Sequence, residues 1–551
     1  MIKSKYSKLS REQLEARLEK LERERYGLVW EDKEEDVAKQ CETELPVLVE
    51  DITREIVSDP EKPYNFIIEG DNYHSLYTLN FTHKKKIDVI YIDPPYNTGK
   101  KNEWKYNDSW VDRNDKYRHS KWLSFMSKRL RLAKNLLKNN GVIFISIDNN
   151  EFAQLKLLCD NVFGENNFCG QIIWRKKSGG GQTDDFFVTE HEYILCYRRS
   201  DRFVWIDECI PMSEKGYKSE DENGKYRLVK LAKWGTAARK QDRPTMHFSL
   251  KSPDGTKIYP IAPDGSAGRW RVGKKKMKML IENNLVEWDK IDNEWIAYEK
   301  MYYDSEDIKT IKNRSIYYSI AETGDATRLL TSIFGKKDVF ENPKPIELIQ
   351  ELLSHSNNSI VLDFFAGSAS TGHAVLELNK QDKGDRQFIL CTNNENNICE
   401  EVTYPRVKKV IEGYADKDGI PANIKYFKQS FVPNVTSDKD KRELVNRSTE
   451  LLCMAENTFE MCVKRNSKSD FAIFKNATKQ TAIIYDEESI KKCVKKLNEK
   501  QEELDTVIYV FSYDHTYEAD DFENLNISFT VKPIPEAILN IYRKISKMYK
   551  K

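Results

Sequence analysis

Residues 87–96, IDVIYIDPPY, form an apolar run that stops at two successive prolines. The run has the length and β-branched content of a buried strand, and Pro94 and Pro95 cannot continue its hydrogen-bond ladder. A second such run, SIVLDF at residues 359–364, leads into small residues and a helical pattern. Strands that alternate with helical segments indicate a parallel sheet covered by helices. The predicted fold class is therefore α/β, with a doubly wound, mostly parallel sheet.

The chain divides into five predicted segments. The strand and helix rhythm covers residues 51–165 and returns at 332–432, whereas 166–331 is irregular and rich in aromatic and basic residues. We expect an inserted α+β domain at 166–331, between two halves of one α/β domain. Residues 1–50 are expected to form an N-terminal helical segment. Residues 433–551 are expected to form an α/β C-terminal domain, to which the sequence assigns no chemistry.

Length and composition exclude several classes of protein. A chain of 551 residues is expected to contain more than one hydrophobic core. It has no apolar stretch of the roughly 18 to 20 residues that span a bilayer, and its first residues lack the apolar part of a secretion signal. We therefore expect a cytoplasmic protein with no membrane partner. The ten cysteines form no Cys-x-x-Cys pair, so neither a metal site nor a disulfide framework is predicted.

The net charge of +1 does not by itself indicate a nucleic-acid partner, but one region is strongly basic. Residues 227–278 contain 14 Lys and Arg against three acids, with Trp234 and Trp270 interleaved. Basic side chains suit phosphates and aromatic faces suit bases, although a solvated basic surface without a partner gives the same pattern. The candidate DNA-binding residues are Arg239, Arg243, Arg269, Arg271, Lys274, Lys275 and Lys276.

The DPPY stretch carries the first candidate chemistry. Two prolines fix a stiff corner at the carboxyl end of a strand, where open α/β sheets bind ligands. The corner presents the carboxylate of Asp93, the carbonyl of Pro94 and the ring of Tyr96. Two acceptors and a ring suit an exocyclic amine on a planar base, because accepting both hydrogens exposes the nitrogen lone pair. A purely structural turn is the alternative interpretation of such a motif.

The second candidate stretch is residues 363–372, DFFAGSASTG. Small residues let a ligand approach the backbone, and the following helix begins with free N–H groups. The stretch is neither a dinucleotide fingerprint nor a P-loop, and tight packing of a helix on a strand is the alternative explanation. Glu395, after the next predicted strand, suits a pair of ribose hydroxyls, but a surface acid is an equally simple interpretation.

Together these motifs resemble a known family. Residues 93–96 resemble the catalytic motif of S-adenosylmethionine-dependent amino-methyltransferases acting on DNA, and residues 363–368 resemble their cofactor motif. The catalytic motif comes first and a basic insertion separates the two, as in the permuted β class. Other stretches are similar to the modification (Mod) subunits of type III restriction-modification systems, namely GDN at 70–72, WLSFM at 122–126, SIDNNE at 146–151, HEYIL at 191–195, DRPTM at 242–246 and FENPKP at 340–345.

The resemblance implies a function. It implies transfer of a methyl group from S-adenosylmethionine to N6 of an adenine flipped out of double-stranded DNA. It also implies a homodimer and a possible helicase-nuclease (Res) partner subunit. Two alternatives stay open: a catalytically inactive DNA-binding specificity subunit, and a methyltransferase that acts on cytosine N4 or on RNA.

The resemblance also implies residue roles. The catalytic residues are Asp93, Pro94, Pro95 and Tyr96. The cofactor site comprises Asp71, Lys344, Pro345, Asp363, Phe365, Gly367, Ser368 and Glu395. In this assignment Glu395 binds the ribose, Asp71 lies near the cofactor's adenine, and Lys344 with Pro345 lies near its methionine end. The chain departs from many relatives at Ala369, where they have a second glycine, and His191 is disfavoured as a general base.

Overall fold

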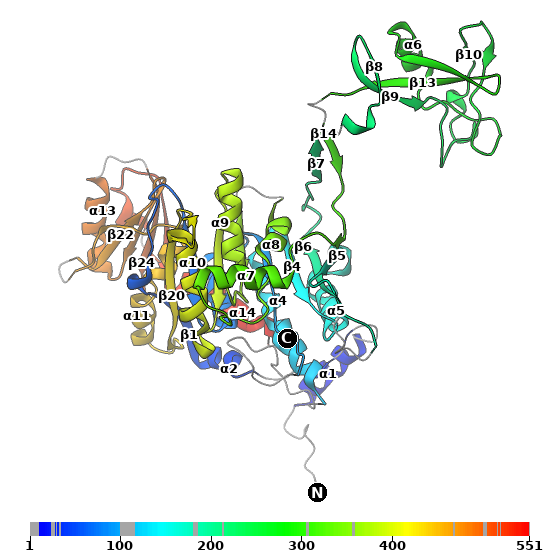
Figure 1. Ribbon diagram of the computed structural model, residues 1–551. Helices are drawn as coiled ribbons and strands as arrows, with labels where there is room; N and C mark the ends of the chain where they lie inside the picture. The colour runs from blue at the N-terminus through cyan, green and yellow to red at the C-terminus, as the bar shows by residue number, and fades with distance from the viewer. Residues whose placement is uncertain are drawn as a thin grey trace. The chain divides into compact units, whose positions relative to one another are not determined.

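The structure is a computed structural model, and it describes residues 10–23, 28, 30–31, 35–99, 116–179, 186–211, 214–304, 308–354, 359–466, 469–499, 504–514, 516–517 and 519–549. The chain forms two compact units. The first comprises residues 1–205 and 314–551, and the second is Ile206–Asn313 (Figure 1).

A ten-stranded sheet organises the first unit. Its strands, in spatial order, are β1 (Glu44–Glu50), β20 (Asn423–Pro433), β2 (Tyr64–Glu69), β17 (Gln387–Thr392), β16 (Ile360–Asp363), β3 (Ile87–Ile92), β4 (Leu137–Ile147), β6 (His191–Arg198), β5 (Phe168–Arg175) and β15 (Ile316–Tyr317). All neighbours from β20 to β4 pair in parallel. β1 pairs antiparallel with β20, and β6 pairs antiparallel with β4 and β5. The predicted doubly wound, mostly parallel α/β fold is confirmed.

Helices cover both faces of this sheet, which explains why its central strands are apolar throughout. Alternate residues of β3 belong to opposite cores: Ile90 packs in one and Val89 in the other. Helices of the first core are α3 (Asn72–Thr82), α4 (Arg118–Leu136) and α5 (Phe152–Phe163). Helices of the second are α8 (Ile346–Leu353), α9 (Ser370–Asp382) and α10 (Tyr404–Glu412).

The two motif-bearing strands lie side by side at the centre of the sheet. β16 and β3 pair in parallel, with Val361 opposite Val89 and Leu362 opposite Ile90. Because parallel strands end at the same edge, the DPPY corner and the small-residue turn leave the sheet next to each other. This is the position at which open α/β sheets form ligand crevices.

The N-terminal segment is only partly helical. It contains α1 (Arg11–Arg23) and α2 (Asp36–Thr43), but Glu44–Glu50, also expected to be helical, forms edge strand β1. Its sequence, ELPVLVE, is a short apolar run whose four central residues are buried. Burial beside β20 therefore decides its conformation.

Among the described helices, none is both long and apolar enough to cross a bilayer.

The C-terminal residues add a second, five-stranded sheet to the first unit. Its strands are, in order, β21 (Glu460–Val463), β22 (Phe471–Lys475), β23 (Lys479–Ile484), β24 (Asp505–Phe511) and β25 (Phe529–Ile534). The helices of this C-terminal part of the chain are α11 (Asp438–Asn446), α12 (Thr449–Glu456), α13 (Ile490–Asn498) and α14 (Glu536–Tyr549). The Tyr542 hydroxyl of α14 donates to the Pro46 carbonyl at 2.8 Å, which ties this part of the chain to β1.

The second unit begins at Ile206, well inside the region 166–331 predicted as an insertion. Segments of that region outside this unit pair with or pack on the large sheet, including β5, β6 and α7 (Thr323–Phe334). The unit contains an antiparallel sheet of β12 (Val286–Ile291), β13 (Glu294–Tyr302), β9 (Gly224–Lys230) and β8 (Ser219–Asp221). It also contains α6 (Lys274–Glu282), β10 (Leu250–Lys251), β11 (Lys257–Ile258), and the pair β7 (Glu208–Pro211) and β14 (Ile308–Ile311).

Candidate active site

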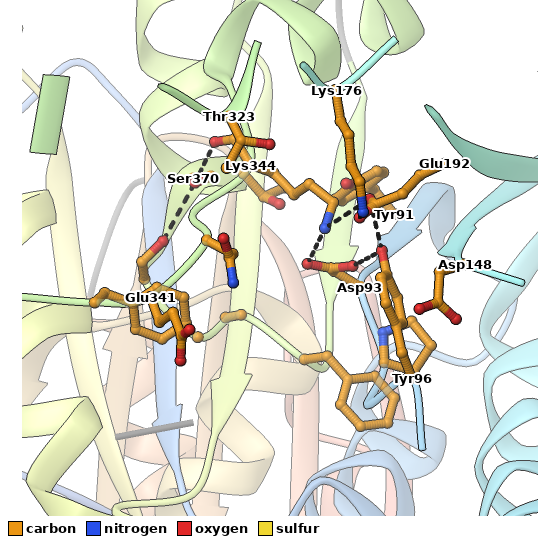
Figure 2. Close-up of a pocket in the computed structure, with 18 of the residues that line it drawn as sticks. Tyr91, Asp93, Tyr96, Asp148, Lys176, Glu192, Thr323, Glu341, Lys344 and Ser370 are labelled. Atoms are coloured by element: carbon orange, nitrogen blue, oxygen red, sulfur yellow. Dashed lines mark hydrogen bonds and ion pairs between the residues drawn. The ribbon is translucent and has the colours of Figure 1, made fainter. Parts of the chain in front are cut away.

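A cavity of about 580 Å³ opens at the carboxyl ends of β3 and β16. Both candidate motifs line it, together with residues from β6 and from the loop before α8 (Figure 2). Its lining includes Tyr91, Asp93, Pro94, Tyr96, Asp148, Lys176, Glu192, Phe340, Lys344, Asp363, Phe365, Gly367, Ser368 and Ser370. The structure therefore brings the two candidate stretches, 270 residues apart in sequence, into one site.

Buried contacts hold the diproline corner in place. The Trp122 indole N–H of α4 donates to the Pro95 carbonyl at 2.7 Å. Two residues further along, Asn97 donates to Glu151 at 2.5 Å, and the φ of Asn97 is +58°. Pro95 is thus engaged from behind, whereas Pro94 lines the cavity. Contacts with α4 and with Glu151 therefore hold the corner in place.

Asp93 lies in a dense network of polar contacts. The Tyr96 hydroxyl donates to Asp93 Oδ1 at 2.7 Å, and Lys344 Nζ lies 2.8 Å from Asp93 Oδ2. Both donors also reach Glu192 Oε2, at 3.1 Å from Tyr96 and 3.3 Å from Lys344. Lys176 Nζ lies 3.0 Å from Glu192 Oε1. Two ammonium groups therefore balance two carboxylates in a largely buried cluster (Figure 2).

The lysines and carboxylates of this cluster shift one another's pKa values towards the charged forms. Burial acts to lower the pKa of Lys344, but Asp93 and Glu192 outweigh it and hold that pKa above its ordinary value. Burial acts to raise the pKa of Glu192, but Lys344 and Lys176 bring it below its ordinary value. Burial, Asp93 and Glu192 all raise the pKa of Tyr96, which therefore stays a neutral donor. Lys344 and Glu192 therefore both carry their charge at neutral pH.

The small-residue turn after β16 is also pre-formed. Asp363 accepts the Phe365 N–H at 2.9 Å and the Thr371 hydroxyl at 2.5 Å. Burial raises the pKa of Asp363 to about 7, although these two hydrogen bonds act to lower it. Gly367 has a φ of +45°, and a Cβ at that position would lie 3.2 Å from the Phe340 ring. Ala369 has a φ of +61°, a conformation that favours glycine.

Two buried residues that the sequence did not single out support this turn from behind. The Thr403 hydroxyl donates to the Gly367 carbonyl at 2.6 Å. Arg406 of α10 donates to the Ser368 carbonyl and to the Ser370 hydroxyl, both at 2.9 Å. Burial lowers the pKa of Arg406 to about 10. Neither residue lines the cavity, so both shape the turn from its rear side.

Three predicted cofactor residues lie outside the cavity lining. Asp71 is the N-cap of α3, where it accepts the Tyr73 N–H at 2.7 Å, and it also pairs with buried Arg129 at 3.3 Å. Pro345 is the N-cap residue of α8. Glu395 is exposed in a short 3-10 helix after β17. The assignments of these three residues stay predictions.

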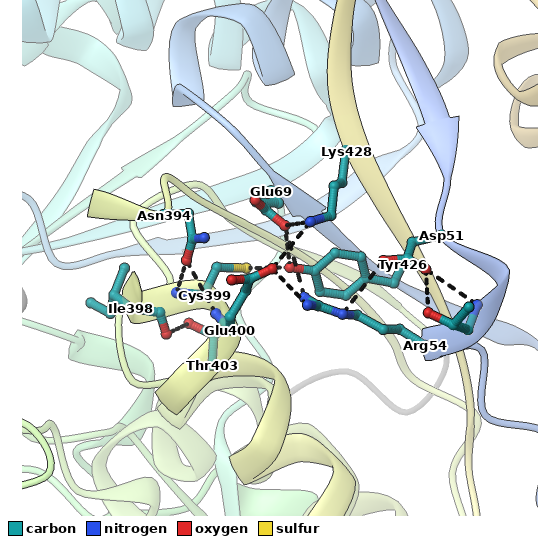
Figure 3. Close-up of polar contacts among 11 residues, drawn as sticks. Asp51, Arg54, Glu69, Asn394, Ile398, Cys399, Glu400, Thr403, Tyr426 and Lys428 are labelled. Atoms are coloured by element: carbon teal, nitrogen blue, oxygen red, sulfur yellow. Dashed lines mark hydrogen bonds and ion pairs between the residues drawn. The ribbon is translucent and has the colours of Figure 1, made fainter. Parts of the chain in front are cut away.

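A polar network fixes the chain that follows Glu395 (Figure 3). Arg54 stacks over the Tyr426 ring, with 4.7 Å between guanidinium carbon and ring centroid, and lies 2.6 Å from Glu400. Glu400 also lies 3.1 Å from Lys428 of β20. The network anchors the π-helix Cys399–Thr403, whose last residue holds the Gly367 carbonyl. It therefore contributes indirectly to the shape of the cofactor turn.

The basic candidates in the second unit have different surroundings. Arg269 is buried and donates to the Ala237 carbonyl at 2.6 Å, which indicates a structural role. Arg239 pairs with Asp264 at 2.7 Å and Arg271 with Glu299 at 3.3 Å. Five candidates are exposed, namely Arg239, Arg243, Lys274, Lys275 and Lys276, and Lys276 also lies 3.7 Å from Glu299. The three lysines form the first turn of α6.

Glu192 is the principal cavity residue to which sequence reasoning gave no role. It sits in the HEY stretch beside His191, whose ring contacts the Tyr193 hydroxyl at 3.0 Å. Glu192 points to the cavity from β6. An acid within a strand-like apolar run is unusual, because burial of an unpaired carboxylate is costly. That signal could have marked Glu192.

Comparison with known proteins agrees with this geometry. The family described as DNA methylase matches residues 87–404, from β3 to the start of α10. The chain belongs to this DNA methylase family. The chain is 32% identical over 400 residues to the type III restriction-modification enzyme StyLTI Mod subunit of Salmonella typhimurium. The aligned residues cover 67% of this chain and 59% of that subunit.

Two further relatives have comparable identity. The EcoPI Mod subunit of Escherichia phage P1 is 33% identical over 423 residues, covering 68% of this chain and 64% of that subunit. The type II methyltransferase M.KpnI of Klebsiella pneumoniae is 35% identical over 355 residues, covering 61% of this chain and 82% of that enzyme. The chain thus spans about three-fifths of the length of the two Mod subunits it matches.

Proposed function

We propose that this protein is a site-specific DNA adenine-N6 methyltransferase and the modification subunit of a type III restriction-modification system. The observation that carries the proposal is the shared cavity, in which Asp93, Pro94 and Tyr96 face the turn around Gly367. An acceptor pair suited to a base amine therefore lies next to a small-residue turn suited to a cofactor. Membership of the DNA methylase family and similarity to Mod subunits support the same assignment.

The residues present fit S-adenosylmethionine as the cofactor. The Lys344 ammonium is suited to a carboxylate, Asp363 to a cationic group, and the turn at Gly367 and Ser368 to close approach of the ligand to the backbone. When bound, this cofactor supplies an electrophilic methyl group. The cavity offers about 580 Å³, which lies within the usual range for ligand sites.

The chain's own part in the reaction is to hold and polarise the base. The exocyclic amine of adenine is a poor nucleophile because its lone pair is delocalised into the ring. Asp93 and the Pro94 carbonyl would accept its two hydrogens, which favours tetrahedral nitrogen, while Tyr96 would stack on the ring. An acid at the first position of the motif favours adenine, since related cytosine-N4 enzymes more typically have serine there.

The reaction product tests this proposal directly. The protein would be incubated with unmethylated duplex DNA and S-adenosylmethionine carrying a labelled methyl group, and the DNA then digested to nucleosides. We expect the label in N6-methyl-2′-deoxyadenosine. Label in N4-methylcytosine, transfer to RNA alone, or no transfer would favour one of the alternative functions.

We also propose that the protein is cytoplasmic, acts as a homodimer and partners a Res helicase-nuclease subunit. Support comes from the similarity to type III Mod subunits, which are one part of a restriction-modification enzyme. Sedimentation of the purified protein, alone and with a co-expressed Res subunit, measures both associations. A monomer with no affinity for such a subunit would contradict them.

Cofactor binding should depend on pH through Asp363. Burial raises the pKa of this carboxyl to about 7, so it is protonated in the empty cavity below that pH and ionised above it. Since the ionised form attracts a cationic ligand, affinity for S-adenosylmethionine should rise by up to about tenfold per pH unit towards pH 7 and then level off. Calorimetric titrations of the wild type and Asp363→Asn from pH 5.5 to 8 measure this. Parallel curves for the two proteins would contradict the role of Asp363.

The first turn of α6 is expected to bind DNA phosphates. Lys274, Lys275 and Lys276 lie at the positive end of the helix dipole, an arrangement that costs stability and favours a bound anion. Changing all three to glutamine should lower DNA affinity and reduce the slope of log K against log salt by about one for each phosphate that the variant no longer neutralises. The matched control neutralises Lys491, Lys495 and Lys496 of α13. An unchanged salt slope in the α6 variant would place the DNA surface elsewhere.

A further inference from the structure

The carboxylate that faces the proposed base site already has a strong donor on each oxygen. Asp93 Oδ1 accepts the Tyr96 hydroxyl at 2.7 Å, and Oδ2 lies 2.8 Å from Lys344 Nζ. Charge-assisted contacts of this kind are strong in a buried site. An incoming amine must therefore share or replace them. If Asp93 is to accept the hydrogens of a base amine, Tyr96 and Lys344 need a second acceptor.

Glu192 is such an acceptor. Its Oε2 lies 3.1 Å from the Tyr96 hydroxyl and 3.3 Å from Lys344 Nζ, the same two donors that occupy Asp93. Its other oxygen lies 3.0 Å from Lys176 Nζ, which holds the carboxylate at the cavity wall. Figure 2 shows these side chains converging from β6, from the residue after β5, from the DPPY corner and from the loop before α8. Glu192 is therefore a second acceptor matched to both donors.

Moving the donors from one carboxylate to the other leaves Lys344 with an ionic partner, while the hydrogens of the amine replace both donors at Asp93. Lys344 and Lys176 face Asp93 and Glu192, so the cluster stays neutral whichever carboxylate holds Lys344. Loss of a partner is what makes a buried ion costly. A short shift of Lys344 towards Glu192 keeps it in an ion pair. Glu192 itself is buried in β6 and cannot leave the site.

We propose that Glu192 is a positioning residue that takes Lys344 and Tyr96 from Asp93 when a nucleobase amine enters the cavity. This proposal rests on the proposed methyltransferase function, and it adds a way in which Asp93 becomes available to the base amine. Asp93 then directs its negative charge to the amine and to the positive charge that develops on the nitrogen. Glu192 acts through Lys344 and Tyr96, without contact with the base.

A binding experiment without turnover tests the proposal first. Duplexes would carry either adenine or purine, which lacks the 6-amino group, at the target position, and their affinities would be measured with S-adenosylhomocysteine present. The cost of unpairing the base is the same for any protein variant, so it cancels when variants are compared. Relative to the wild type, Glu192→Gln should lose about three- to tenfold of its preference for adenine over purine.

Kinetics provide the second readout. At saturating S-adenosylmethionine, Glu192→Gln should lower kcat by about 10- to 100-fold and change the KM for the cofactor less than about threefold. Glu192→Asp, which keeps the charge, should recover most of that loss. In a Lys344→Met background the same Glu192→Gln change should lower kcat by no more than about threefold, because the charged one of the two donors that Glu192 accepts is gone.

Glu456→Gln is the matched control. Glu456 is also a buried glutamate with two lysines and a tyrosine as partners, Lys479, Lys532 and Tyr509, but it lies in α12 beside the C-terminal sheet. It should lose stability without losing kcat or the preference for adenine. If Glu192→Gln does not fold, Lys176→Met removes the residue that holds Glu192 and should lower kcat by about three- to tenfold.

The outcomes separate this proposal from the proposed function. A wild type that methylates adenine and prefers it over purine, with a Glu192→Gln variant that behaves identically, would overturn the role of Glu192 alone. An equal loss of kcat from Glu192→Gln with and without Lys344 would also overturn it. A wild type that neither transfers methyl groups nor distinguishes adenine from purine would remove the proposed function and this proposal together.

Discussion

Replacing Asp93 with alanine is expected to lower methyl transfer by at least about 10³-fold, because it removes a charged acceptor aimed at the position where positive charge develops. The fold should survive the change. Lys344 keeps Glu192 at 3.3 Å as an ionic partner, and the diproline corner keeps its bond from Trp122. DNA binding should also survive, since the basic candidates lie in the second unit. Rates would be measured with labelled S-adenosylmethionine.

A matched substitution on the same strand controls for a general effect of charge removal. Asp88 lies at the other end of β3, paired with Lys138 at 2.7 Å. Asp88→Asn keeps an acceptor for the Ile360 N–H and should leave transfer within about threefold of the wild type, the scale of an exposed ion pair. Asp93→Asn, by contrast, should be severely impaired. Wild-type rates in either Asp93 variant would contradict the assigned role.

Replacing Lys344 with methionine is expected to destabilise the first unit by about 3 kcal/mol, near the lower end of the range for removing one partner of a buried ion pair. The change leaves Asp93 and Glu192 close together, with Lys176 as the remaining cation that contacts Glu192. Affinity for S-adenosylmethionine should fall as well, because a buried ammonium is lost from the cavity. Urea unfolding and calorimetric titration measure the two effects.

The appropriate control is Lys138→Met, which breaks an ion pair that is 39% exposed on the lysine side. Exposed pairs contribute about 0 to 1 kcal/mol, so this variant should lose much less stability. Adding Glu192→Gln to Lys344→Met should recover part of the loss, since it removes one of the two carboxylates that then repel each other with Lys176 as their shared cation. Equal destabilisation by Lys344→Met and Lys138→Met would show that the buried cluster is not balanced by Lys344.

Much of the fold and part of the site could be predicted because their signals are local. The run at residues 87–92 and its two prolines define a strand and its end within ten residues, and the DNA methylase family match begins at the same strand. Both motifs follow parallel neighbours, so their proximity follows from the fold class. β1 was missed because its conformation depends on β20, which lies about 380 residues further along the chain.

The rest of the site depends on contacts that no local pattern records. Glu192 reaches Tyr96 across 96 positions, and Arg406 reaches Ser368 across 38. Asp71 and Arg269 also make contacts that the sequence did not predict: Asp71 caps α3 and pairs with Arg129, and Arg269 donates to the Ala237 carbonyl. Charge and spacing mark residues that can bind. Tertiary structure decides which of them face the cavity.

The most direct measurement is a crystal structure of the protein with S-adenosylhomocysteine and a duplex that contains its recognition sequence. We predict an extruded adenine whose 6-amino nitrogen lies about 3 Å from Asp93 and from the Pro94 carbonyl, with the cofactor against Gly367. We also predict that Lys344 lies closer to Glu192 than to Asp93. A stacked adenine, or an extruded base bound away from Asp93, would contradict the proposed mechanism.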